Sequence, residues 1–180
     1  AWPVPKLMRI GSLPNYGYEG DLLLPVPVTV APDFAPPASG MVAVRLNATW
    51  LVCRVECIPE SGQFTLQLPA QGATVLHASA FDQARARQAQ PLAGAAQATV
   101  TGERLQLRVA GLPERLRGQT LMVFPETPEV LVPAARLGSD WTQSWDGAVW
   151  TADLPLSPQR GETPERLPLV LAVDGSSDAG

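Results

Sequence analysis

The chain has 180 residues, which is enough for one large domain or two small ones. Charged residues make up only 17% and the formal net charge is -4, so the basic surplus of a nucleic-acid-binding protein is missing. No run of about 18 apolar residues is present, and we expect no direct membrane insertion by this segment. The chain opens at Ala1 without an initiator Met or a visible signal peptide. We therefore expect a mature or excised segment, whose missing signal does not argue for the cytoplasm.

Proline and glycine set the expected fold class. The chain has 19 prolines and 15 glycines, and proline is excluded from helix interiors and central strands. Short strands separated by many turns are therefore favoured over helices. The predicted fold class is all-β, with two β-sandwich domains joined by a short helix-containing linker.

The first domain is expected to span residues 1–76 and to begin with a loop or edge segment over residues 1–20. Leu22–Val30 is apolar but interrupted by prolines, which suits an edge strand. The alternation of Met41–Trp50 predicts a strand, which Leu51–Cys53 can continue. Pro59 and Gly62 are then expected to close a turn before a returning strand at Gln63–Leu68.

The linker is expected over residues 77–91. Its segment after His77 is rich in Ala, Gln and Arg and lacks Pro and Gly, so it predicts a helix that Pro91 ends. The second β-sandwich is expected over residues 92–175, where turn signals separate six expected strands. They are Gln97–Thr101, Arg104–Val109, Gln119–Phe124, Glu129–Ala135, Ala148–Leu154 and Leu167–Val173.

Cys53 and Cys57 are the only two cysteines, and their spacing is C-x3-C. A disulfide between them requires the backbone to turn, because Cα atoms must come within about 7 Å. A disulfide that closes such a small ring stabilises the fold little, because the entropic stabilisation grows with loop length and reaches roughly 3 kcal/mol at about 15 residues. A small ring is also expected to carry strain, which raises the reduction potential. This favours a redox role over a stabilising one.

Two other interpretations of the cysteine pair stay open. The bridge can be a structural one in an interaction module, which predicts a buried disulfide that resists reductants. The two thiolates can also hold copper(I), whereas zinc would lack ligands because His77, the only histidine, is far away in sequence. Arg54 could favour a thiolate and Glu56 and Glu60 could oppose one, so the direction of a thiol pKa shift stays open at this point.

Several segments together resemble a known family. Tyr16–Val30 (YGYEGDLLLPVPVTV) and Trp50–Pro69 (WLVCRVECIPESGQFTLQLP) are similar to the N-terminal region of the DsbD/ScsB-type protein-disulfide reductases. The opening AWPVPK resembles the W-P-x-P segment of the ScsB-like branch. Softer similarities to the companion domain of that branch lie at Phe81 with Ala84–Arg85, at Val123–Ala135 and at Leu167–Gly175.

The resemblance implies two immunoglobulin-like sandwiches in a periplasmic part of an inner-membrane protein. It implies that Cys53 and Cys57 form a redox-active disulfide and that no cofactor is needed. Electrons would arrive from membrane and thioredoxin-like domains of the same parent protein and leave to thioredoxin-fold periplasmic partners. A cap loop with an aromatic residue shields the pair in relatives, which makes Tyr16, Tyr18 and Glu19 the cap-loop candidates.

The sequence also departs from this family. The better-studied DsbD branch has a wider cysteine spacing, and members of the ScsB-like branch carry a further segment before W-P-x-P. The first sandwich is therefore expected either to be completed by a missing piece or to be shortened. No thioredoxin-like C-x-x-C is present, so this chain is expected to need other domains for the complete relay.

Overall fold

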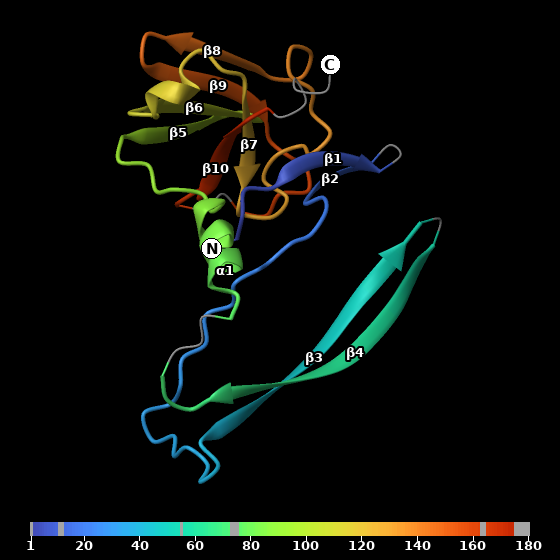
Figure 1. Cartoon of the computed structure of the whole chain (residues 1–180). Coiled ribbons are helices and arrows are strands. Elements are labelled where there is room, and N and C mark those ends of the chain that lie inside the picture. The colour runs from blue at the N-terminus through green and yellow to red at the C-terminus, as the bar shows by residue number, and fades with distance from the viewer. Residues whose placement is uncertain (1, 11–12, 55, 73–75, 163–164, 175–180) are drawn as a thin grey trace. The chain divides into compact units, whose positions relative to one another are not determined.

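The computed structural model of the chain describes residues 2–10, 13–54, 56–72, 76–162 and 165–174. The chain divides into two compact units (Figure 1). The discontinuous unit combines Ala1–Leu24 with Ala84–Gly180, and the hairpin unit is Pro25–Gln83. Both consist mainly of β-strands, which confirms the all-β prediction. None of the helices in the described part of the chain is long and apolar enough to cross a membrane.

The discontinuous unit contains one larger antiparallel sheet and two strand pairs. The larger sheet has the order β5 (Ala96–Thr101), β6 (Arg104–Ala110), β9 (Val149–Pro155), β8 (Thr142–Asp146). One pair joins β7 (Leu121–Pro125) to β10 (Leu169–Val173), and the other joins β1 (Lys6–Ile10) to β2 (Leu13–Gly17). A short 3-10 helix, Glu114–Leu116, precedes β7.

The core of this unit lies between the larger sheet and β7. Alternate residues of β6 and β9 are buried, as expected for strands with one face against a core. Trp150 and Leu121 are fully buried at its centre. The core cluster consists of Leu105, Leu107, Val109, Leu121, Val123, Val130, Leu131, Trp141, Trp150, Ala152, Leu154 and Leu156.

The Gln143 side chain satisfies the polar groups beside this core. Its Oε1 accepts hydrogen bonds from the Leu121 backbone N–H and from Trp150 Nε1, both at 2.9 Å. Its Nε2 donates to the Leu121 carbonyl at 3.1 Å. One amide thus ties β8 to β7 and to the buried indole.

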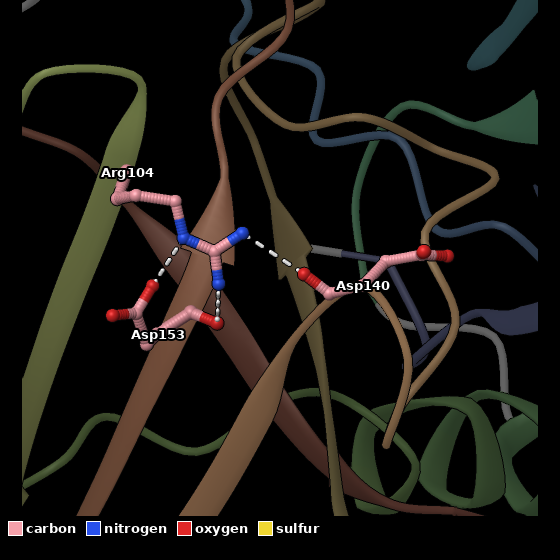
Figure 2. A network of polar contacts seen from close by, with 3 residues as sticks. All are labelled: Arg104, Asp140 and Asp153. Atoms are coloured by element: carbon pink, nitrogen blue, oxygen red, sulfur yellow. Dashed lines mark hydrogen bonds and ion pairs between the residues drawn. The ribbon is translucent and has the colours of Figure 1, made fainter.

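A polar network on the larger sheet links β6, β9 and the turn before β8 (Figure 2). The Arg104 guanidinium forms an ion pair with the Asp153 carboxylate. It also donates to the Asp153 carbonyl and the Asp140 carbonyl, each at 2.9 Å. Because both charged side chains are partly exposed, we assign this network a positioning role rather than a large stabilising one.

The hairpin unit is built on two long antiparallel strands, β3 (Met41–Cys53) and β4 (Cys57–Pro69). Figure 1 shows them as a long twisted ribbon. Every residue from Met41 to Cys53 has a partner in β4, from Met41 opposite Pro69 to Cys53 opposite Cys57. The helix α1 (Ala78–Ala86) follows the hairpin and crosses the boundary between the two units.

The structure corrects the expected segments in the first half of the chain. Residues 1–20 hold the β1–β2 hairpin rather than a loop or single edge segment. Leu22–Val30 forms no strand, because Pro25 and Pro27 lack amide donors. Val26 and Val28 there are 72% and 81% exposed. Pro59 and Gly62 do not close a turn: β4 runs through both, which a strand with a free edge tolerates.

Further corrections concern the helix and the second half. The helix ends at Ala86, ahead of Pro91, because Gln88 leaves it to form an antiparallel bridge with Pro3. No strand forms at Glu129–Ala135, where Glu129 has a positive φ of 58° and only Leu131 makes an isolated bridge. The strand β8 was not expected from the sequence, because its alternation is mostly polar.

Candidate functional site

Cys53 and Cys57 are the last facing pair of the β3–β4 hairpin and are joined by a disulfide. Their Cα atoms are 4.1 Å apart, close to the roughly 4.5 Å of facing residues whose side chains approach most closely in an antiparallel ladder. The chain reverses between them, where the Arg54 N–H donates to the Glu56 carbonyl at 3.2 Å. Val55 lies outside the described residues. The turn that the C-x3-C spacing demands is therefore present.

The disulfide is open to solvent. Both cysteines are exposed, as are Arg54 and Glu56 in the turn between them. A structural bridge would be expected to be buried, and this one is not. Access is the first requirement for attack by a partner's thiolate, because exchange rates depend on which sulfur can be reached.

The hairpin has one apolar and one polar face. Side chains alternate between the faces along each strand, and the register places the even-numbered residues of both strands together. The apolar face consists of Val42, Val44, Leu46, Ala48, Trp50, Val52, Ile58, Gly62, Phe64, Leu66 and Leu68, with Glu60 as its one charged residue. Cys53 and Cys57 belong to the odd-numbered, mostly polar face.

The two glutamates near the cysteines differ in their surroundings. Glu60 lies opposite Trp50 in the register, and its Oε2 accepts a hydrogen bond from Trp50 Nε1 at 3.2 Å. Both residues are on the face that does not carry the cysteines. Glu56 precedes Cys57 directly, in the turn. Of the two carboxylates, Glu56 is therefore the one placed to act on the disulfide.

The three cap-loop candidates each have partners inside the discontinuous unit. Tyr16 packs edge-on against Phe124 with ring centroids 5.2 Å apart, and its partial burial raises the pKa of its hydroxyl. Tyr18 donates from its hydroxyl to the Pro3 carbonyl at 2.8 Å. Glu19 pairs with Lys6 at 3.4 Å. The cysteine pair belongs to the hairpin unit, so shielding by these residues stays a prediction.

These contacts also explain where the chain divides. Because Tyr16 packs on β7, the first 24 residues belong with the second half of the chain. The domain boundaries expected at 1–76, 77–91 and 92–175 stay predictions.

Within the described residues, no cluster of three or more His, Cys, Asp or Glu side chains could hold a metal ion. His77, the only histidine, is exposed and adopts a positive φ of 138°. A two-thiolate copper(I) site requires fewer ligands and would use only the two cysteines.

Comparison with known families adds one finding. Residues 1–69 match the family model described as thiol:disulfide interchange protein DsbD, N-terminal. This part of the chain is a DsbD-type N-terminal region. The match confirms the resemblance seen at Tyr16–Val30 and Trp50–Pro69, and it covers the whole hairpin with both cysteines.

DsbD N-terminal domains are extracytoplasmic parts of larger proteins that work with thiol–disulfide partners. The similarities expected in the second half of the chain lie outside the matched residues and stay predictions. No curated protein and no solved structure matches the chain significantly.

Sequence reasoning found the cysteines but missed what lies next to them. Leu51 faces Pro59 across the hairpin, two register steps from the disulfide and on the same face. The sequence analysis places Pro59 in a turn, and a turn residue would have no partner in β3. The signal that could have found it is the spacing of the cysteines, because a three-residue turn between them fixes the register of both strands.

Proposed function

We propose that the chain is a periplasmic thiol–disulfide exchange domain of a protein-disulfide reductase. Its Cys53–Cys57 pair takes two electrons from the membrane-embedded part of the same parent protein, through a thioredoxin-like domain. It passes them to thioredoxin-fold partner proteins. The observation that carries the proposal is an exposed disulfide at the end of a hairpin within a DsbD-type region.

The transfer balances as two successive exchanges. In the reduced chain, one cysteine thiolate attacks a sulfur of the partner disulfide and forms a mixed disulfide. The second cysteine, as thiolate, then attacks the sulfur of the first. This releases the partner as a dithiol and re-forms Cys53–Cys57. Two electrons and two protons pass to the partner, and a donor dithiol returns the chain to the reduced state by the reverse sequence.

The chain's own residues supply access and placement rather than a cofactor. The ladder of facing pairs from Met41 to Cys53 holds the two sulfurs within bonding reach. The small ring limits the stability that the bond adds, to about 2 kcal/mol for five residues. Reduction therefore costs the fold little, which suits a bond that must open in every cycle.

The reduction potential tests this proposal. The chain is equilibrated in glutathione or dithiothreitol redox buffers, and its free thiols are counted by mass spectrometry. We expect a potential above about -300 mV with rapid exchange, as for catalytic and labile disulfides. A much lower potential with slow exchange would leave the structural interpretation of the bridge.

A further inference from the structure

On the polar face of the hairpin, one pair that is apolar on both strands lies directly beside the disulfide, and the other such pair lies at the opposite end of the strands. Moving away from the cysteines on this face, the facing pairs are Leu51 with Pro59, then Thr49 with Ser61, then Asn47 with Gln63. Only the first of these pairs is apolar on both strands. Leu51 and Pro59 are defined here as the platform.

The platform is not explained by packing within the chain. Leu51 is 63% exposed, which is more than any other large hydrophobic side chain of β3 and β4. Pro59 is exposed as well, and neither residue belongs to the buried core cluster. An apolar side chain left in water forgoes the favourable free energy of burial. A partner that covers it would recover that free energy.

We propose that Leu51 and Pro59 form the docking platform for a thioredoxin-fold partner that carries an apolar surface around its reactive cysteine. The inference rests on the proposed function. In thiol–disulfide exchange the attacking sulfur must come within bonding distance of Cys53 or Cys57. The partner surface next to that sulfur then lies over the neighbouring step of the same face, which is the platform.

The chemistry of the platform selects the kind of surface that fits it. Leu51 and Pro59 carry no charge, and the exposed charges of the adjacent turn, Arg54 and Glu56, are of opposite sign. A strongly charged partner surface would gain little here and would lose hydration. An apolar surface gains by burial, as the central residues of protein interfaces do.

The experiment compares a protein reductant with a small one. Reduction of the Cys53–Cys57 disulfide is followed with reduced thioredoxin and, separately, with dithiothreitol, for the unaltered chain and for Leu51→Ser. We expect the substitution to slow reduction by thioredoxin about tenfold, the effect of losing one buried leucine contact. Reduction by dithiothreitol needs no platform and should change less than about twofold.

Two variants serve as controls. Val52→Ser removes an aliphatic side chain of similar exposure, 50%, from the neighbouring position on the opposite face. It should leave both rates near those of the unaltered chain. Leu51→Met keeps the apolar volume and should retain the thioredoxin rate.

The outcomes separate the platform from the proposed function. An unchanged thioredoxin rate in Leu51→Ser, or equal slowing in Val52→Ser, would overturn the platform. Equal slowing of Leu51→Ser with both reductants would also overturn it, since the effect would then lie in the disulfide itself. A chain that dithiothreitol reduces but thioredoxin does not would rule out this partner class. Failure of the unaltered chain to exchange even with dithiothreitol would instead remove the proposed function.

Discussion

Trp50 donates its indole N–H to the Glu60 carboxylate across the hairpin, on the face opposite the disulfide. The contact links β3 to β4 three register steps from the cysteines. It also occupies the Glu60 carboxylate on the apolar face.

This relationship predicts unequal effects of the two acidic residues near the disulfide. Glu56→Gln should raise the reduction potential of Cys53–Cys57, because removing a negative charge next to Cys57 favours the thiolate and thus the reduced form. Glu60→Gln should leave the potential nearly unchanged. Equilibration of both variants in glutathione buffers measures the difference, and an equal shift would contradict the assignment of the faces.

Removing the disulfide should cost the hairpin little stability. In Cys53→Ala/Cys57→Ala we expect the free energy of unfolding to fall by no more than about 2 kcal/mol relative to the oxidised chain. The other facing pairs of β3 and β4 remain. Urea titration of the two proteins checks this, and a loss of 4 kcal/mol or more would indicate a structural bridge.

Tyr16 provides a pH-dependent prediction. Partial burial raises the pKa of its hydroxyl above the ordinary 10.0, so the folded chain holds the phenolic proton more tightly than the unfolded chain does. The stability from this group is complete below pH 10 and is lost as the pH rises through the raised pKa. Between about pH 9 and about pH 11, one unit on either side of the ordinary pKa, the free energy of unfolding should therefore fall less in Tyr16→Phe than in the unaltered chain.

The same tyrosine tests the predicted cap. If Tyr16 shields the disulfide, Tyr16→Ala should speed oxidation of the reduced Cys53–Cys57 pair by hydrogen peroxide. Tyr18→Phe serves as the matched control, because it keeps the ring and loses only the hydrogen bond to Pro3. Equal oxidation rates in all three proteins would leave Tyr16 with its packing role on Phe124 alone.

Gln143 should matter for stability more than its surface strand suggests. Gln143→Ala leaves the Leu121 N–H and Trp150 Nε1 without their acceptor. We expect a loss of about 2–4 kcal/mol in the free energy of unfolding, since unsatisfied buried donors cost about 1–3 kcal/mol each. Ser144→Ala on the same strand is the control, and it should cost less than about 1 kcal/mol because Ser144 is exposed.

The sequence predicts the strands whose side chains alternate between apolar and polar. The alternation of Arg104–Val109 and of Ala148–Leu154 marks β6 and β9, and the alternation of Met41–Trp50 marks β3. The immunoglobulin-like form of the domains stays a prediction. The expected strand at Glu129–Ala135 fails because the apolar pattern there does not reveal the positive φ of Glu129.

The sequence predicts the disulfide of the candidate site but not the contacts around it. The C-x3-C spacing points to a local disulfide, and the structure contains it. Pro59 by itself predicts a turn, because proline is a turn signal unless its missing donor faces a free strand edge, and only the cysteine spacing indicates that β4 continues through it. The contact of Tyr16 with Phe124 joins residues far apart in the sequence, where no local pattern operates.

The position of the disulfide at the last pair of the hairpin has a mechanical consequence. When the bond opens, the freed cysteines are attached only to the short turn on one side, and on the other side the pairing from Val52–Ile58 onward remains. We therefore expect the oxidised and reduced forms to differ at this end of the hairpin, while the pairing of the two strands stays the same. The proposed electron transfer can then proceed without refolding, because the other facing pairs of β3 and β4 do not depend on the disulfide.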